Sequence, residues 1–195
     1  DIVAILLTHR HYDTSGAAKF LSEKYDAPVF IHPAASNSLI SNDQLTTWAS
    51  RYDSDMPVTE TIELTDGWEM DLGGGYIRCI HTPGHTNCHS SFFIPELSIL
   101  FAGDLIPSPE YPGRTDLPTG NIPKMLESIE KIIQLNPEVI VPSRGKTIRK
   151  QEVQRVLNKH RDFFISLIEN LGELPENWPK PNSTCMWWSP NPEWK

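Results

Sequence analysis

The chain has 195 residues, of which 38% are apolar and 22% charged, and its formal net charge at neutral pH is −8. This length fits one domain with an apolar core. The acidic balance argues against a nucleic-acid partner, because such a surface needs clustered Lys and Arg. The longest apolar stretches, such as residues 2–7, are much shorter than the ~20 residues that span a bilayer, so no membrane segment is expected.

The three cysteines, Cys79, Cys88 and Cys185, show no paired spacing. An odd number without a pattern does not indicate a disulfide framework. We therefore expect a reducing environment, the cytoplasm or another intracellular compartment.

The first half of the chain alternates between strand and helix patterns. The expected order is strand 2–7, helix 16–25 capped by Thr14 or Ser15, strand 28–32 and helix 34–40. Such a βαβ order predicts parallel strands covered by helices. Residues 41–57 are mostly polar around Trp48 and predict a surface excursion that borders a functional site, and 58–72 predicts two short strands around Asp66-Gly67.

The second half begins with a β pattern and ends with two long helices. Strands are expected over 76–81, 90–94, 98–102 and 139–141, and helices over 121–135 and 150–171. Residues 172–195 hold five prolines and four tryptophans. Proline excludes a regular helix or central strand there, and the tryptophans are too apolar for a solvated linker. We expect a domain over 1–171 and a tail, 172–195, that wraps over it or docks on a protein partner or a second copy.

A possible metal motif follows the first apolar run. His9, His11 and Asp13 stand at alternate positions, where two imidazoles and a carboxylate can converge on one point. Zinc favours these ligands, and a catalytic zinc keeps one position open for water. A single His-x-His also occurs by chance, so the interpretation depends on residues elsewhere that complete the ligand set.

Two later strand ends supply such residues. The turn Pro83-Gly84 presents His85 from a loop after strand 76–81. Asp104 follows Gly103 at the end of strand 98–102. An aspartate in that position is by itself more often a turn former or helix cap than a ligand.

Taken together, these motifs resemble the metallo-β-lactamase superfamily. They are Thr-His-x-His-x-Asp (8–13), His-Thr-Pro-Gly-His-Thr (81–86), Phe-Ala-Gly-Asp-Leu (101–105) and a strand ending in Pro-x-x-Gly (142–145). The loop 113–120 is similar to that of glyoxalase II-type thioesterases and persulfide dioxygenases. The resemblance covers residues 1 to about 150 and implies an αββα sandwich with the metal at the common edge of two sheets. In the family, further strands precede the His-x-His motif, so we expect the N-terminal strands to be missing from this chain.

The resemblance implies ligand roles for four residues. His9, His11 and His85 match the histidines of the first metal site, and Asp104 matches a carboxylate that bridges to a second metal. Two histidines of the second site are replaced, by Thr14 and Arg144. A guanidinium is always protonated and repels a cation.

We therefore expect a mononuclear site. One zinc would generate a bound hydroxide, with Asp13 or Asp104 orienting the nucleophile. Arg144 would occupy the second position and pair with Asp13.

Three functions remain open from the sequence. The favoured one is a zinc-dependent hydrolase of a thioester or related acyl compound, a small-molecule substrate. The second is a mononuclear iron dioxygenase acting on sulfur compounds, with His9, His85 and Asp104 as its ligands. The third is a degenerate binding or assembly subunit. Candidate residues for the substrate pocket are Tyr12, His89 and Arg114.

Overall fold

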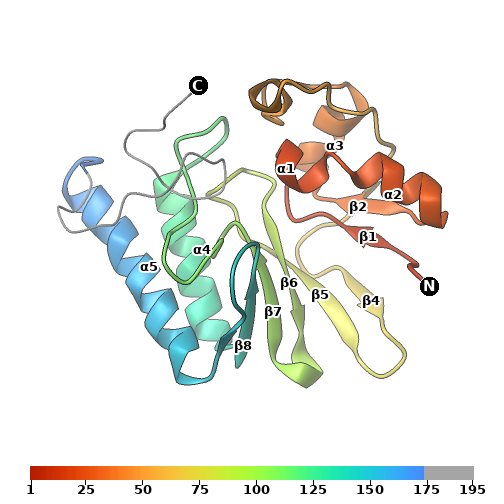
Figure 1. Ribbon diagram of the computed structural model, residues 1–195. Coiled ribbons are helices and arrows are strands. Elements are labelled where there is room, and N and C mark those ends of the chain that lie inside the picture. The colour runs from red at the N-terminus through yellow and green to blue at the C-terminus, as the bar shows by residue number, and fades with distance from the viewer. Residues whose placement is uncertain (174–195) are drawn as a thin grey trace.

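The computed structural model describes residues 1–173, which form two sheets packed face to face between two layers of helices (Figure 1). The first sheet is parallel, with the order β1-β2-β3. Its strands are β1 (Ile5–Leu6), β2 (Val29–Ile31) and β3 (Ile62–Glu63), and its helices are α1 (Tyr12–Ser15), α2 (Ala18–Tyr25), α3 (Pro33–Ile40) and the 3-10 turn η1 (Ala49–Tyr52). The predicted βαβ order with parallel strands is confirmed.

The second sheet is mixed and has the order β4-β5-β6-β7-β8-β9. Its strands are β4 (Glu69–Asp71), β5 (Tyr76–His81), β6 (Ser90–Ile94), β7 (Ile99–Gly103), β8 (Val139–Pro142) and β9 (Ile148–Arg149), with the 3-10 turn η2 (Pro95–Leu97) between β6 and β7. The pair β7 and β8 is parallel, and the helix α4 (Ile122–Leu135) connects these strands. The last described helix is α5 (Gln151–Glu169), which packs on α4.

Three apolar clusters fill the spaces between these layers. One lies between the second sheet and α4 and α5, and includes Leu100, Ile129 and Leu157. A second joins the first sheet to α2 and α3, and a third, with Phe92, lies between the two sheets. The expected αββα sandwich is therefore confirmed.

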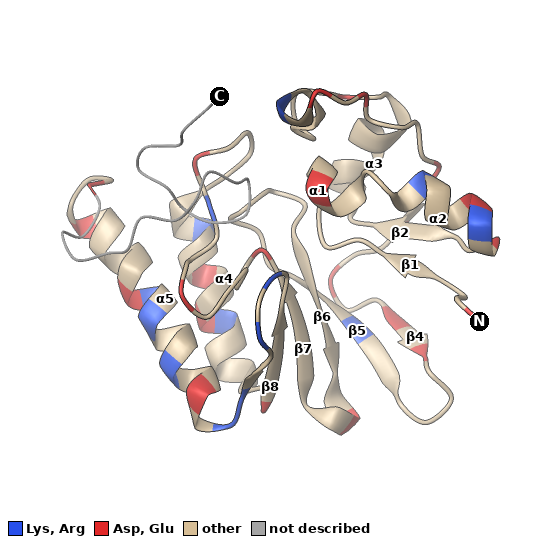
Figure 2. Ribbon diagram, viewed as in Figure 1, with Lys and Arg blue, Asp and Glu red and all other residues tan. Residues whose placement is uncertain are grey.

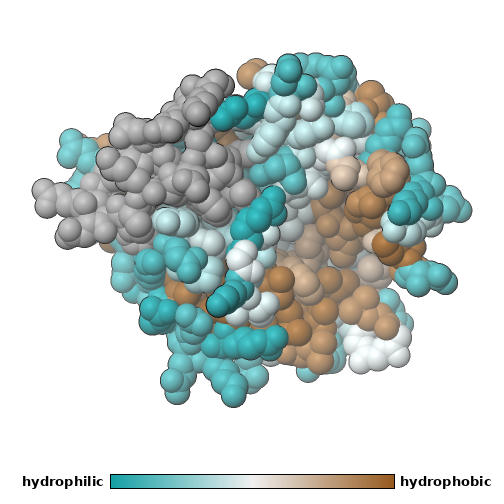
Figure 3. Space-filling view, in the orientation of Figure 1, coloured by the Kyte–Doolittle hydropathy of each residue, from teal (hydrophilic) through white to brown (hydrophobic). Residues whose placement is uncertain are grey.

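The first strand is shorter than predicted. The expected strand 2–7 contributes only Ile5–Leu6 to the ladder, while Ile2 and Val3 are 45% and 73% exposed. The physical reason is the position of β1, which pairs with β2 alone and forms the edge of its sheet. Figure 3 shows an apolar surface, in brown, in the region of β1 and the strands of the second sheet; the partly exposed Phe101 comes from that sheet.

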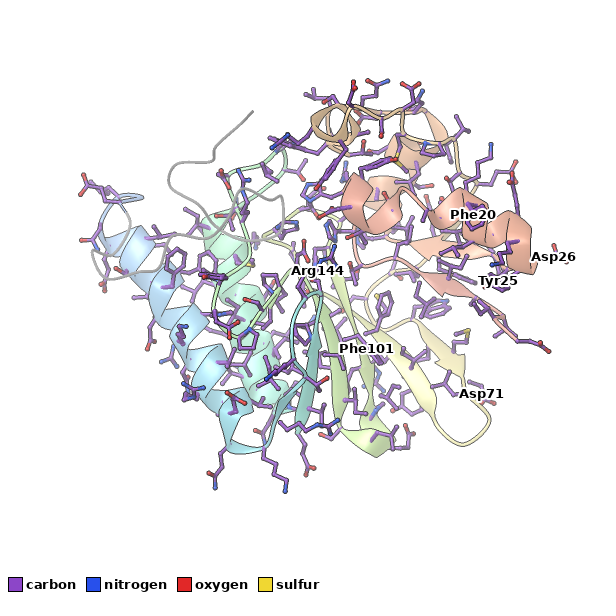
Figure 4. All side chains as sticks on the ribbon, in the orientation of Figure 1. Phe20, Tyr25, Asp26, Asp71, Phe101 and Arg144 are labelled. Carbon is purple, nitrogen blue, oxygen red and sulfur yellow. The ribbon has the colours of Figure 1, made fainter. Side chains whose placement is uncertain are left out.

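The predicted helix 16–25 is present as α2 but begins two residues later, at Ala18, and neither Thr14 nor Ser15 caps it. Ser15 Oγ donates back to the carbonyl oxygens of Arg10 and His11 instead of capping the next helix. Ala18 is the buried residue of α2, whereas Phe20 is 62% exposed and points outward (Figure 4). The Ser15 side chain therefore stabilises the turn that follows His9 and His11.

The segment 58–72 is not a hairpin. Its two short strands exist, but β3 pairs with β2 in the first sheet and β4 pairs with β5 in the second. The turn at Asp66-Gly67 therefore carries the chain from one sheet to the other. A local turn signal does not reveal which partner each flanking strand will find.

Other features agree with expectation or lie outside the described chain. Asn121 caps α4 by accepting a hydrogen bond from the Lys124 amide at 2.9 Å. None of the helices within 1–173 is long and apolar enough to cross a membrane. Acidic and basic residues are interspersed along α4 and α5 (Figure 2). The predicted docking of the Pro- and Trp-rich tail concerns residues that, beyond 173, are outside the described part.

Candidate metal centre

Four segments that follow strand ends meet at one edge of the sandwich. His9 and His11 follow β1, and His85 follows β5. Asp104 follows β7, and Ser143 follows β8. The strand ends of both sheets therefore bring together residues that are far apart in the sequence.

The ligand atoms of the three histidines face each other. One nitrogen of each of His9, His11 and His85 lies within 4.8 Å of the other two, and all three residues are fully buried. His11 Nδ1 is 2.8 Å from His85 Nε2, and Asp104 Oδ2 lies 3.6 Å from His9 Nε2 and 3.4 Å from His85 Nε2. Ligands at 2.0–2.1 Å in a tetrahedral shell are separated by about 3.3 Å, so these spacings match a zinc-like ion.

Two of these atoms have no hydrogen-bond partner within residues 1–173. Among the described residues, His9 Nε2 and Asp104 Oδ2 are buried and have no hydrogen-bond partner. Burying such groups unsatisfied costs free energy, which a metal ion would offset. The residues present therefore fit a metal ion.

Hydrogen bonds to the opposite ring nitrogens orient two of these ligands. His85 Nδ1 donates to the carbonyl oxygen of Arg114 at 2.8 Å, and His9 Nδ1 lies 3.0 Å from Thr8 Oγ1. The bond to Arg114 leaves the Nε2 lone pair of His85 directed at the site, as is usual for metal-bound histidine, and donation from His9 Nδ1 to Thr8 would do the same for His9.

The electrostatics also favour ligand-competent imidazoles. Burial lowers the pKa of His9 and of His11 well below the ordinary value, and neighbouring His85 lowers both further. Burial likewise lowers the pKa of His85 to about 4. The three rings are therefore neutral at pH 7, the form that binds a metal.

The surroundings of Asp104 shift the pKa of its carboxyl group. Burial raises its pKa well above the ordinary value, and the nearby Asp13 carboxylate raises it further. A hydrogen bond donated by Ser143 Oγ to Asp104 Oδ1 and the charge of Arg144 act in the opposite direction. A cation at Oδ2 would favour the ionised form.

The second-site positions have distinct environments. Both carboxylate oxygens of Asp13 are buried. Arg144 is exposed, and its Nη1 donates to the Ser143 carbonyl oxygen at 3.0 Å. Figure 4 shows Arg144 near the end of the second sheet. Thr14 lies in α1, partly buried. Pairing of Arg144 with Asp13 stays a prediction.

His89 contacts the backbone of Asp104. It is fully buried, which excludes an exposed position, and burial lowers its pKa well below the ordinary value. Its Nε2 accepts a hydrogen bond from the Asp104 amide at 3.0 Å, and its Nδ1 lies 2.9 Å from Thr82 Oγ1. A Cβ on Gly103 would stand 2.7 Å from His89 Nε2, so glycine is needed for this approach. His89 therefore positions the ligand Asp104, a different role from the predicted substrate contact.

Replacing His89 with glutamine is expected to lower metal affinity or hydrolytic activity by about 10- to 100-fold, the usual cost of losing a residue that orients a ligand. Metal content after dialysis against a graded series of chelator concentrations would measure this. A matched control is His32→Asn, because His32 lies outside the site as the N-cap of α3 and asparagine is a good N-cap. Unchanged affinity in His89→Gln would contradict the role.

Arg10, between the two motif histidines, is a structural residue that the sequence did not reveal. It is 4% exposed, and its guanidinium donates to Cys88 Sγ, Asn87 Oδ1 and the carbonyl oxygen of Ala34. These bonds tie the His9 loop to the His85 loop and to α3. Nothing in the local sequence distinguishes a buried arginine at this position from an exposed one.

The other two pocket candidates are placed differently. Arg114 is fully buried, and its guanidinium donates two hydrogen bonds of 2.9 and 2.7 Å to the Asp116 carboxylate. Arg114 contributes to the site through its carbonyl oxygen, which accepts the hydrogen bond from His85 Nδ1. Tyr12 is partly buried next to His11, with its ring centre 5.5 Å from that of Tyr52.

Comparisons with known proteins agree with this geometry. The family model described as the metallo-beta-lactamase superfamily matches residues 1–144. The probable metallo-hydrolase YqgX of Bacillus subtilis (strain 168) is 34% identical over 151 residues, 72% of this chain and 67% of that protein.

Two solved structures have similar folds. TTHA1623 in a di-iron-bound form is 30% identical, with a TM-score of 0.66 over 80% of this chain and 75% of that chain. The BLEG-1 B3 metallo-beta-lactamase is 28% identical, with a TM-score of 0.70 over 83% of this chain and 77% of that chain. The chain spans about two thirds of the length of the curated relatives it matches: 64% of an uncharacterized protein of Aquifex aeolicus (strain VF5) and 67% of YqgX.

Proposed function

Since this chain belongs to the metallo-β-lactamase superfamily, we propose that it hydrolyses a thioester or a related acyl substrate with one zinc ion. The observation that carries the proposal is the convergence of three neutral, buried histidines, whose nitrogens lie within 4.8 Å of one another, with Asp104 Oδ2 3.4–3.6 Å from two of them. The similarity to a probable metallo-hydrolase supports hydrolysis. The likeness of loop 113–120 to glyoxalase II-type thioesterases supports the acyl class.

His9, His11 and His85 would hold the ion, with Asp104 beside it and one position left for water. A zinc ion bound there supplies a Lewis acid and lowers the pKa of a coordinated water toward neutrality. Asp13 or Asp104 would orient the attacking water. The hydrogen bond from His85 to the Arg114 carbonyl oxygen and the contact between His9 and Thr8 keep these two imidazoles in a fixed orientation, so little reorganisation is needed during the reaction.

The residues of the second position support a single ion. Thr14 and Arg144 replace the family's histidines, and the Arg144 charge acts on Asp104 from that side. Ser143 Oγ donates a hydrogen bond to Asp104 Oδ1, so this oxygen already has a partner. A cation there would have to displace a hydrogen bond and approach a positive charge.

An iron-dependent dioxygenase is the second candidate. His9, His85 and Asp104 together offer two histidines and one carboxylate, with both nitrogens 3.4–3.6 Å from the same oxygen. That ligand set suits mononuclear non-haem iron. TTHA1623 has been solved with two iron ions, so iron is accepted by a relative of 30% identity.

The test combines metal analysis with activity. Purified protein is expected to bind one equivalent of zinc and to hydrolyse a thioester, with loss of activity on chelation and recovery with zinc. The double variant Thr14→His/Arg144→His is expected to bind two equivalents, which checks that the count reports the second site. Two equivalents in the unaltered chain would contradict the single-ion proposal, iron-dependent oxygen uptake would favour the dioxygenase, and a metal-free inactive protein would favour a binding subunit.

A further inference from the structure

The chain that follows β7 contacts the metal centre twice. The first contact is Asp104, whose carboxylate lies beside His85 Nε2, and the second is Arg114, whose carbonyl oxygen accepts the hydrogen bond from His85 Nδ1. Gly113 lies so close to the first contact that a Cβ on it would stand 2.0 Å from the Asp104 carbonyl oxygen. Residues 105–113 therefore form a closed loop, and the position of this loop decides where two groups of the centre lie.

Helix α5 holds the middle of the loop 105–113. Lys159 Nζ donates to the Glu110 carbonyl oxygen at 3.0 Å. Figure 1 shows this stretch, in green, beside α5. The Glu110 amide donates to Ser108 Oγ at 3.2 Å, so the held stretch is also turned on itself. The last described helix is thus in contact with a loop whose two ends lie at the metal centre.

His160, the next residue of α5, is a buried histidine outside the metal centre. It is fully buried, and neither ring nitrogen makes a hydrogen bond of standard geometry with the residues that the structure describes. Burial is the main cause that lowers its pKa to about 3, the charge of Lys159 adds to this, and the backbone of Pro109 acts in the opposite direction. The ring is therefore neutral at pH 7 and carries one N–H that needs an acceptor.

The carbonyl oxygen of Pro109 is the acceptor beside this ring. Proline has no N–H, so the backbone group of Pro109 that acts on His160 is its carbonyl oxygen. An imidazole N–H directed at that oxygen offsets the free-energy cost of burying the ring. Pro109 precedes Glu110, which accepts the bond from Lys159. Two successive residues of α5 therefore contact two successive residues of the loop.

The loop also contacts the segment that follows β8. The Arg144 amide donates to the Pro107 carbonyl oxygen at 2.9 Å. The preceding residue, Ser143, donates through Oγ to Asp104 Oδ1. A displacement of Pro109, two residues after Pro107, would therefore reach Asp104 by two routes, along the chain itself and through this segment.

We propose that His160 is a positioning residue of the metal centre. Its ring N–H engages the Pro109 carbonyl oxygen and holds the loop 105–113, so that Asp104 and the Arg114 carbonyl oxygen keep their places. An apolar side chain at position 160 would fill the same space but could not hold the carbonyl group. This role rests on the proposed function only in so far as that function requires a metal centre, and it does not depend on which reaction occurs there.

The test compares stability with zinc affinity in the full-length His160→Leu variant. Stability of the metal-free chain should change little, because a buried polar ring is replaced by an apolar group of similar size and the partly exposed Pro109 can bind water instead. The affinity for zinc should fall by about tenfold, as for other residues that orient a ligand. Chemical denaturation measures the first quantity, and competition with a chelator measures the second.

Three further variants make the comparison specific. Val153→Ala removes buried packing from the first turn of α5, two turns before His160, and should lower stability without changing zinc affinity. His160→Gln keeps an N–H donor and should restore most of the affinity. Lys159→Met should lower the affinity by about threefold, as loss of one hydrogen bond implies, and it tests the hold on the loop even if His160→Leu does not fold.

Hydrogen exchange followed by mass spectrometry gives a readout that needs no metal. In the metal-free chain, the amides of residues 105–114 should exchange faster in His160→Leu than in the unaltered chain. Val153→Ala should show no such selective change in this segment. Because zinc is absent from the measurement, it decides the role of His160 even in a protein that binds no zinc.

The outcomes separate this role from the proposed function. Unchanged loop exchange in His160→Leu, with full zinc affinity, would overturn the role. An equal loss of affinity in Val153→Ala would overturn it as well, because the effect would then follow stability alone. A protein that binds no zinc but shows the faster loop exchange would support the role of His160 and contradict the zinc hydrolase, whereas zinc-dependent hydrolysis with an affinity that ignores residue 160 would do the reverse.

Discussion

Replacing His11 with alanine is expected to release the metal ion and to lower hydrolysis by at least about a thousandfold. The metal supplies several kcal/mol of transition-state stabilisation, and each 1.36 kcal/mol corresponds to a factor of ten. His11 Nδ1 lies 2.8 Å from His85 Nε2, so its removal opens the ligand shell directly. Metal analysis of the purified variant, together with initial rates on the thioester, would measure both effects.

The thermal midpoint provides an independent readout of the same variant. A ligand that binds only the native state raises stability with its concentration, so zinc should raise the Tm of the unaltered chain. The Tm of His11→Ala should respond much less. The control His32→Asn changes a histidine outside the centre and should keep the response to zinc. A zinc-dependent Tm in His11→Ala equal to that of the unaltered chain would show that His11 is not a ligand.

Replacing Gly113 with alanine is expected to destabilise the chain by about 3 kcal/mol, because the added atom cannot be accommodated without moving backbone. A Cβ at Gly113 would stand 2.0 Å from the Asp104 carbonyl oxygen and 2.6 Å from Met125 Cε. For a chain of this length, that loss corresponds to a Tm lower by about 6–12 °C. Since the displaced oxygen belongs to Asp104, metal affinity should fall as well.

Gly74→Ala is the matched control for that variant. A Cβ at Gly74 would meet no atom within 4 Å, and this glycine lies in the turn between β4 and β5. Its substitution should change stability by less than about 0.5 kcal/mol. Chemical denaturation of both variants would compare them. A neutral Gly113→Ala would mean that the connection between β7 and α4 moves easily and does not hold Asp104.

The long helices and the ligand set were predictable from the sequence because their signals are local. Helix α4 begins beside its asparagine cap, and α5 falls within residues 150–171 as its apolar period indicates. The motif around His9 and the turn before His85 have short-range signatures. Their convergence followed from the resemblance to a family, and the structure places their nitrogen atoms within 4.8 Å.

The roles of His89 and Arg114 could not be predicted, because they depend on contacts across the fold. The Asp104 amide bonds to a residue 15 positions earlier, and the His85 ring bonds to a carbonyl oxygen 29 positions later. A polar side chain in the sequence carries no mark of whether it will face solvent or support a ligand. Both residues were expected at the substrate pocket for this reason.

The sequence by itself determined the strand and helix order and the residue types able to bind a metal, and its resemblance to the family implied that Thr14 and Arg144 replace two second-site histidines. Only the tertiary structure decided that β3 and β4 belong to different sheets, that Arg10 is buried as a tie between loops, and that the Arg114 carbonyl oxygen bonds to His85. The physical reason is that periodicity and turn chemistry act over a few residues. Pairing partners, burial of single polar groups and the walls of a pocket are set by packing between segments that are distant in the chain.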